Sequence, residues 1–104
     1  MFRINVEKNG GQHVITLVGM LNAAAYKDYR EALMGIPSHA AVRIVSSGVE
    51  ATPEGVSAWI QTVNQYVANC KVVYAPSKFS TMVQARLATH THPPADFEST
   101  SLAV

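Results

Sequence analysis

The sequence predicts a single α/β domain, with a four- to five-stranded mixed sheet and three to four helices in the order β-β-α-β-α-β-α-β. Three observations predict it. An Asn-Gly-Gly turn at residues 9–11 marks an opening hairpin. The apolar, β-branched run Val42, Ile44 and Val45 is typical of a strand covered on both faces. An amphipathic helix follows that run, and right-handed crossovers then place helices against the sheet.

The first half of the chain alternates strand and helix signals. Residues 2–7 alternate apolar and polar side chains, which predicts a half-buried strand, and residues 14–18 form the returning strand. Asn22 is a suitable cap for a helix over residues 23–34, with Tyr26, Tyr29 and Leu33 on one face. The segment 35–37, Gly-Ile-Pro, ends that helix.

The middle of the chain predicts a strand, a loop and a long helix. The turn-forming residues 46–48, Ser-Ser-Gly, are expected to end the strand, so that residues 48–57 form a loop leading into the helix. Thr52 is expected to cap the helix, with Pro53 and Glu54 in its first turn. The helix is expected to reach Asn69 with one inward stripe: Val56, Trp59, Ile60, Val63 and Val67.

The last third predicts a fourth strand at residues 71–75 and a third helix at residues 77–89. The inward side chains of that helix are expected to be Phe79, Met82, Val83 and Leu87. Pro93 and Pro94 prevent its continuation. Residues 95–100 are predicted to form a short edge strand, and the tail from about residue 99 to be a last turn or flexible. The domain spans residues 1–104.

The order of these motifs resembles the STAS family, the domain of the anti-sigma-factor antagonists. Gly19, Leu21 and Asn22 match the family's step from second strand to first helix. The segment 47–49, Ser-Gly-Val, matches the end of the buried strand, and Gly55 matches the glycine at the start of the second helix. The segment 73–77 is similar to the family's strand and Pro-Ser opening of the third helix. The resemblance spans nearly the whole chain and implies a regulatory module that binds proteins.

The chain departs from the family at the regulatory position. Phosphorylated members carry a serine after the aspartate at the start of the second helix, whereas Pro53 stands here and has no hydroxyl. Thr52 and Ser57 are nearby hydroxyls, but neither occupies the matching position. We therefore expect no serine phospho-switch at this helix. Glu54 is interpreted as a first-turn residue that stabilises the helix, with a permanent charge in place of phosphate as the alternative.

The amino-acid composition of the chain limits the classes of function that we expect. The chain is 48% hydrophobic and only 14% charged, against the ~25% charged residues typical of soluble domains. A chain with so few charged residues often buries part of its surface against a partner or a second copy of itself, so a homodimer remains among the hypotheses. The net charge is +1 without a basic cluster, so nucleic-acid binding is not expected. A single cysteine, no signal-like segment and no membrane-length apolar run predict a cytoplasmic protein without membrane insertion.

The sequence contains no assembled catalytic or metal-binding motif. Its candidate nucleophiles, Ser46, Ser47 and Thr52, have no histidine nearby, and no nucleophile elbow or phosphate-binding loop is present. His90 and His92 lie near Asp96 and Glu98, but the segment is interpreted as a solvated loop rather than a metal site. We expect no enzyme activity, no cofactor and no metal.

The outer face of the second helix is the strongest candidate for a contact surface. No charged residue lies between Glu54 and Lys71, although exposed helices normally carry Glu and Lys. Loss of charge is typical of interface centres, and the alternative is a face that is neutral and solvated or covered by the chain's own terminus. Tyr66 is the expected anchor. The outward positions of the second helix are expected to be Ser57, Ala58, Gln61, Thr62, Asn64, Gln65 and Ala68.

Two functions remain as hypotheses. The first is a non-enzymatic, bacterial-type signalling module that binds a protein partner through the loop and the second helix. The resemblance implies that the partner is an anti-sigma factor, a related kinase, or a transport or signalling subunit. The second is a STAS-like subunit that binds a small ligand, a lipid or a nucleotide, near the second helix. The predicted contact residues are Gly48, Val49, Glu50, Thr52, Pro53, Glu54, Gly55, Ser57, Gln61 and Gln65.

Overall fold

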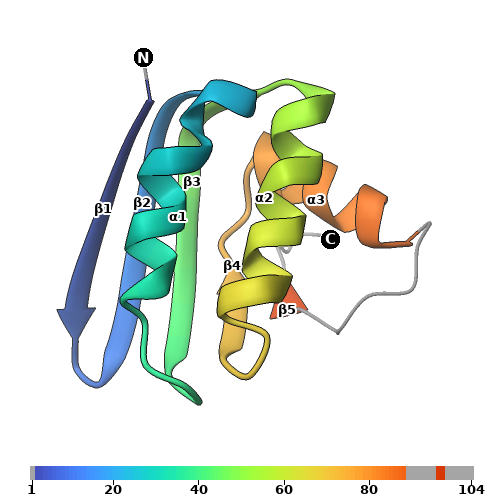
Figure 1. Cartoon of the computed structure of the whole chain (residues 1–104). Helices are drawn as coiled ribbons and strands as arrows, with labels where there is room; N and C mark the ends of the chain where they lie inside the picture. The colour runs from blue at the N-terminus through green and yellow to red at the C-terminus, as the bar shows by residue number, and fades with distance from the viewer. Residues whose placement is uncertain (1, 89–95, 98–104) are drawn as a thin grey trace.

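The computed structural model describes residues 2–88 and 96–97 (Figure 1). The elements in chain order are β1 (Phe2–Asn9), β2 (Gln12–Leu21), the short 3-10 helix η1 (Ala23–Ala25), α1 (Tyr26–Met34), β3 (Ala41–Ala51), α2 (Pro53–Tyr66), β4 (Lys71–Tyr74), α3 (Lys78–Ala88) and β5 (Asp96–Phe97).

Strands β1 to β4 form a mixed sheet whose spatial order follows the chain, 1-2-3-4. The opening hairpin is antiparallel, β2, β3 and β4 are parallel, and the two-residue β5 pairs with β4. Strand β3 is therefore internal, as its two-sided apolarity predicts. The predicted α/β class is confirmed, with a mixed sheet and three helices in one compact domain.

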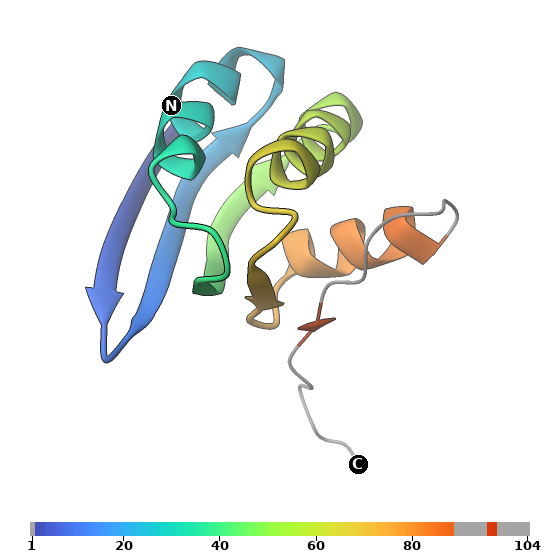
Figure 2. The ribbon, with the colours of Figure 1, turned by 60° about the horizontal axis from the view of Figure 1, so that its bottom comes forward.

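The helices lie over one face of the sheet. Each parallel connection advances by one strand in the same direction, and right-handed crossovers then carry every helix to the same side. Figures 1 and 2 show α1 and α2 side by side over this face. The ring of Phe79 from α3 contacts the ring of Trp59 from α2, so α3 belongs to the same layer.

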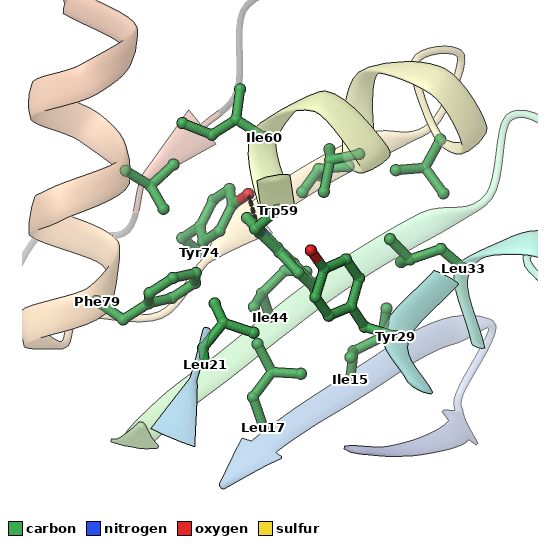
Figure 3. Packing of buried hydrophobic residues seen from close by; sticks show 14 of the residues in the cluster. Ile15, Leu17, Leu21, Tyr29, Leu33, Ile44, Trp59, Ile60, Tyr74 and Phe79 are labelled. Carbon is green, nitrogen blue, oxygen red and sulfur yellow. Dashed lines mark hydrogen bonds between the residues drawn. The ribbon is translucent and has the colours of Figure 1, made fainter. Parts of the chain in front are cut away.

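Trp59 lies at the centre of the core between the helices and the sheet (Figure 3). Its fully buried ring meets Tyr29 of α1 edge-on at 5.2 Å and Phe79 of α3 at 5.9 Å between centroids. Its indole N–H donates a 2.8 Å hydrogen bond to the hydroxyl of Tyr74 in β4. Burial raises the pKa of the Tyr74 hydroxyl. One side chain thus joins α1, α2, α3 and β4, and the predicted inward stripe of α2 is buried throughout.

The predicted end of the third strand is wrong. Strand β3 does not stop at the serines but continues to Ala51, so the expected loop before α2 is reduced to Thr52. A bulge accommodates the turn-forming residues, because Ser46 and Ser47 together face only Leu17 of β2. Pairing with β2 then resumes, and Val49 is buried beneath the helices.

Several other expectations need correction. Helix α2 ends at Tyr66 rather than Asn69, because Val67 leaves the helical conformation. Thr62, expected to point outward, lies on the side of α2 that faces α1 and is buried. Its hydroxyl donates to the Ala58 carbonyl, so the buried polar group has a partner. Tyr26 and Met82, both expected inward, are more than a third exposed.

Most of the predicted tail cannot be compared with the structure. Only β5 falls within the expected edge strand, and the remainder of that segment, the histidine pair and the residues from 98 onward lie outside the described residues. Within the described chain, no helix combines the length and apolarity required to cross a membrane.

Replacing Trp59 by Ala is expected to lower the free energy of unfolding by ~3–5 kcal/mol, since it empties the centre of the core. Tyr74→Phe is the matched variant, because it removes only the hydroxyl that accepts from the indole, and it is expected to cost about 1–3 kcal/mol. Urea denaturation followed by circular dichroism measures both. A Trp59→Ala loss no larger than that of Tyr74→Phe would contradict the central packing role.

Candidate partner-binding surface

The C-terminal ends of β2 and β3 and the first turn of α2 form one tightly connected corner. Thr52 is the single residue between β3 and α2, and its main-chain N–H donates to the Leu21 carbonyl at the end of β2 (3.1 Å). The Thr52 hydroxyl accepts from the N–H of Gly55 at 3.0 Å, which confirms the predicted cap. Pro53 then occupies the first turn of the helix, where no N–H is needed.

Two glycines of the STAS-like motifs have clear physical roles at this corner. A Cβ on Gly55 would overlap the Leu21 carbonyl, so glycine lets α2 rest directly on the end of β2. Gly19 has a φ of 103°, a conformation that side chains disfavour, two residues before the same contact. The motif residues from β2 and from α2 therefore meet at one place.

A second helix cap lies next to the first. The Asn22 side chain accepts from the Ala24 N–H at 3.0 Å, so Asn22 is a cap as predicted, but it caps the 3-10 helix η1 and α1 begins only at Tyr26 rather than at residue 23. Helix α3 also contacts this corner, because the Arg86 guanidinium donates to the Pro53 carbonyl at 3.3 Å. Sequence patterns did not reveal this contact, because the two residues are 33 positions apart and neither belongs to a motif.

The predicted contact residues divide by exposure. Val49 and Gly55 are buried and position their neighbours, while Thr52 and Ser57 are half-buried. The remaining six side chains or glycines are exposed: Gly48, Glu50, Pro53, Glu54, Gln61 and Gln65. The exposed set follows the end of β3, where Glu50 is charged, and the outer face of α2, where Glu54 is the one charged residue.

Tyr66 is held by its own chain. Its hydroxyl accepts from Arg30 Nε of α1 at 3.1 Å, and the guanidinium carbon lies 6.0 Å from the ring centroids of both Tyr66 and Tyr26. The hydrogen bond with Tyr66 and the neighbouring rings raise the pKa of Arg30. This pair joins α1 to α2, and no local pattern predicts it because 36 positions separate the residues.

The serines at the start of α3 cap that helix, and Ser46 from within β3 contacts them. The Ser46 and Ser77 hydroxyls lie 2.9 Å apart. Ser77 accepts from the Ser80 N–H, and Ser80 accepts from the Ser77 N–H, which is a reciprocal capping box. These hydroxyls therefore stabilise the start of α3.

An apolar groove separates α2 from α3 above β4. It is shallow and opens to solvent, with a cavity volume of about 30 Å³, which is room for roughly one or two water molecules. Its lining is Ile60, Val63, Asn64, Val67, Ala68, Cys70, Val72, Tyr74, Val83 and Leu87. Such a lining suits an apolar ligand and offers few polar groups to orient it.

Among residues 2–88 and 96–97, no three His, Cys, Asp or Glu side chains gather as a metal site requires. The chain matches no protein-family model, and no curated protein is significantly similar to it.

Gly55→Ala is expected to destabilise the protein by ~3 kcal/mol or more, because the added methyl overlaps main-chain atoms that are held by pairing. A loss of stability would identify the close contact as its cause, since Gly→Ala inside a helix otherwise stabilises a protein by roughly 0.5–1 kcal/mol. Chemical denaturation measures the change.

Gly48→Ala is the matched control. A Cβ there meets only the Val18 side chain, at 3.6 Å, which is an ordinary contact distance. We expect a change within about 0.5 kcal/mol. Equal effects of the two substitutions would show that the contact of α2 with β2 is not tight.

Proposed function

We propose that this chain is a non-enzymatic regulatory module that binds a protein partner through the end of β3 and the outer face of α2. The observation that carries the proposal is the combination of a rigid corner with a helix face that carries no charge beyond its first turn. Thr52 and Gly55 lock α2 onto β2, and beyond Glu54 the exposed side chains of α2 are uncharged. A rigid surface depleted of charge loses little entropy and little hydration when a partner covers it.

The resemblance to the STAS family supports the same surface. The residues that carry the resemblance come from two separate segments and meet at this corner: Gly19, Leu21, Asn22 and Gly55. The partner implied is an anti-sigma factor, a related kinase, or a transport or signalling subunit. Because a fold by itself does not determine function, the proposal rests on the surface.

A small apolar ligand is the second candidate function. The chemistry of the groove between α2 and α3 supports it, since its lining is mostly Val, Ile and Leu, but the groove would have to widen beyond its volume of about 30 Å³ to admit such a ligand. A lipid chain fits this lining better than a nucleotide, because a nucleotide phosphate needs cationic or N–H donors. Mass spectrometry of molecules that copurify with the protein distinguishes the two functions.

Charge placed on the outer face of α2 is expected to weaken partner binding about tenfold or more, because a buried, unpaired charge loses hydration without compensation. Gln61→Lys and Gln65→Lys keep good helix formers, so stability changes by only a few tenths of a kcal/mol. Gln84→Lys, at an exposed position of α3, is the matched control.

The measurement is quantitative affinity capture from the source cell with the parent and each variant as bait, followed by titration with the purified partner. Thermal melts verify that each bait is folded. Binding by the two α2 variants at the parental level would refute the proposed surface, and so would an equal loss in the Gln84→Lys control.

Thr52 is expected to act as a cap and not as a phosphorylation switch. Thr52→Ala is expected to lower stability by ~1 kcal/mol while partner binding at low temperature is retained. Ser57→Ala, one turn further on, is the control and is expected to change stability by less than about 0.5 kcal/mol.

The switch is tested by incubating the protein with its cognate kinase and mapping sites by mass spectrometry. We expect no stoichiometric phosphate on Thr52 or Ser57. Full modification of Thr52 with loss of partner binding would show that the switch exists in a shifted position.

A further inference from the structure

Strand β1 is a free edge of the sheet. Its eight residues pair with β2 on one side, and Figure 1 shows no described element beyond its other side. Helix α1 covers only its face, where Phe2 meets the Tyr29 ring edge-on at 6.1 Å between centroids. The outer main-chain N–H and C=O groups of β1 therefore form a row that can pair with another strand.

This edge lacks several devices that normally prevent pairing. Proteins protect edges with short strands, prolines or bulges. Strand β1 is long, contains no proline, and pairs with β2 in an unbroken register from Phe2↔Gly19 to Asn9↔Gln12. Val6 is 36% exposed on the side where the helices lie, so an apolar side chain is also uncovered at this edge.

The two charges on the opposite face of β1 lack counterparts within their own sheet. Arg3 and Glu7 are both exposed. Their direct neighbours across the hairpin are Val18 and Val14, and neither charge takes part in an ion pair within the described chain. A positive and a negative charge are thus presented four residues apart on one edge strand.

These charges select one register for pairing with a second copy of β1. In an antiparallel pair, two opposed residues either both point their main-chain groups at each other or both point them away, so in a pair of identical strands both residue numbers are odd or both are even. With Asn5 opposite Asn5, Arg3 faces Glu7 twice and Ile4 faces Val6 twice. Centring the pair on Ile4 leaves Arg3 opposite Asn5, and centring it on Val6 leaves Glu7 opposite Asn5 and Arg3 opposite Asn9, so only the register centred on Asn5 pairs the charges.

We propose that two copies of this chain associate through β1, in antiparallel register centred on Asn5. The interface is isologous, because the two-fold axis passes between the two Asn5 residues and makes every contact occur twice. The two sheets become one continuous sheet with all helices on the same face. The contact lies at the β1 end of the sheet, whereas α3 follows β4 near the other end. It therefore leaves the outer face of α2 uncovered.

The experiment is sedimentation velocity over a wide concentration range, with the parent and the single variants Arg3→Glu and Glu7→Arg. We expect the parent to form a dimer. Each variant is expected to self-associate about thirtyfold more weakly, because two favourable charge pairs become two repulsive ones. Both positions are exposed, so the fold is retained, and thermal melts verify it.

Mixing the two single variants provides the decisive arm. In a mixed dimer each position 3 again faces an opposite charge at position 7, so hetero-association is expected to return to the parental strength. Lys27→Glu on α1 carries the same charge change as Arg3→Glu and is expected to leave the dimer intact. A monomeric parent at all concentrations, unaffected single variants, or failure of the mixture to dimerise would each overturn the proposal.

Discussion

The contact between the first turn of α2 and the end of β2 is the constraint on which the rest of the structure depends. Gly55 rests on the Leu21 carbonyl, and that same carbonyl accepts from the Thr52 N–H. Two polar main-chain groups and one missing side chain thereby set the height and direction of α2 over the sheet. A helix held this closely at its start presents its whole length in one orientation.

The two sides of α2 follow from that position. On the inner side, Trp59 reaches α1, α3 and β4, so the helix is anchored by aromatic packing and one buried hydrogen bond. At its C-terminal end, the Arg30–Tyr66 contact fixes the helix to α1. Because both ends are held from within, the outer side chains need not stabilise the fold. Their composition is therefore free to reflect contact with a partner.

The two proposed surfaces use different physics and different parts of the chain. Beyond Glu54, the α2 surface offers a rigid shape without charge, which favours close packing against another protein. The β1 edge offers main-chain groups and a defined pattern of charge, which favours one strand in one register. Because the edge lies at one end of the strand order and α2 lies above its middle, occupation of one leaves the other accessible.

The sequence by itself determined the order of strands and helices, the inward stripe of α2 and the caps at Asn22 and Thr52. These features depend on side-chain periodicity and on bonds between residues two or three positions apart. The serines before Gly48 predict a strand end that the structure does not have, because pairing with β2 overrides their local turn preference. In the same way, Thr62 is inward because α1 packs beside it.

Only the tertiary structure decided which groups meet across the chain and which remain uncovered. The Arg30–Tyr66 and Arg86–Pro53 bonds join residues more than thirty positions apart, and no local spacing encodes them. Alternation along β1 predicts a strand, yet whether that strand is internal or at an edge depends on what packs beside it. Local patterns specify the elements because they act within a few residues, whereas neighbours are selected by packing the whole chain.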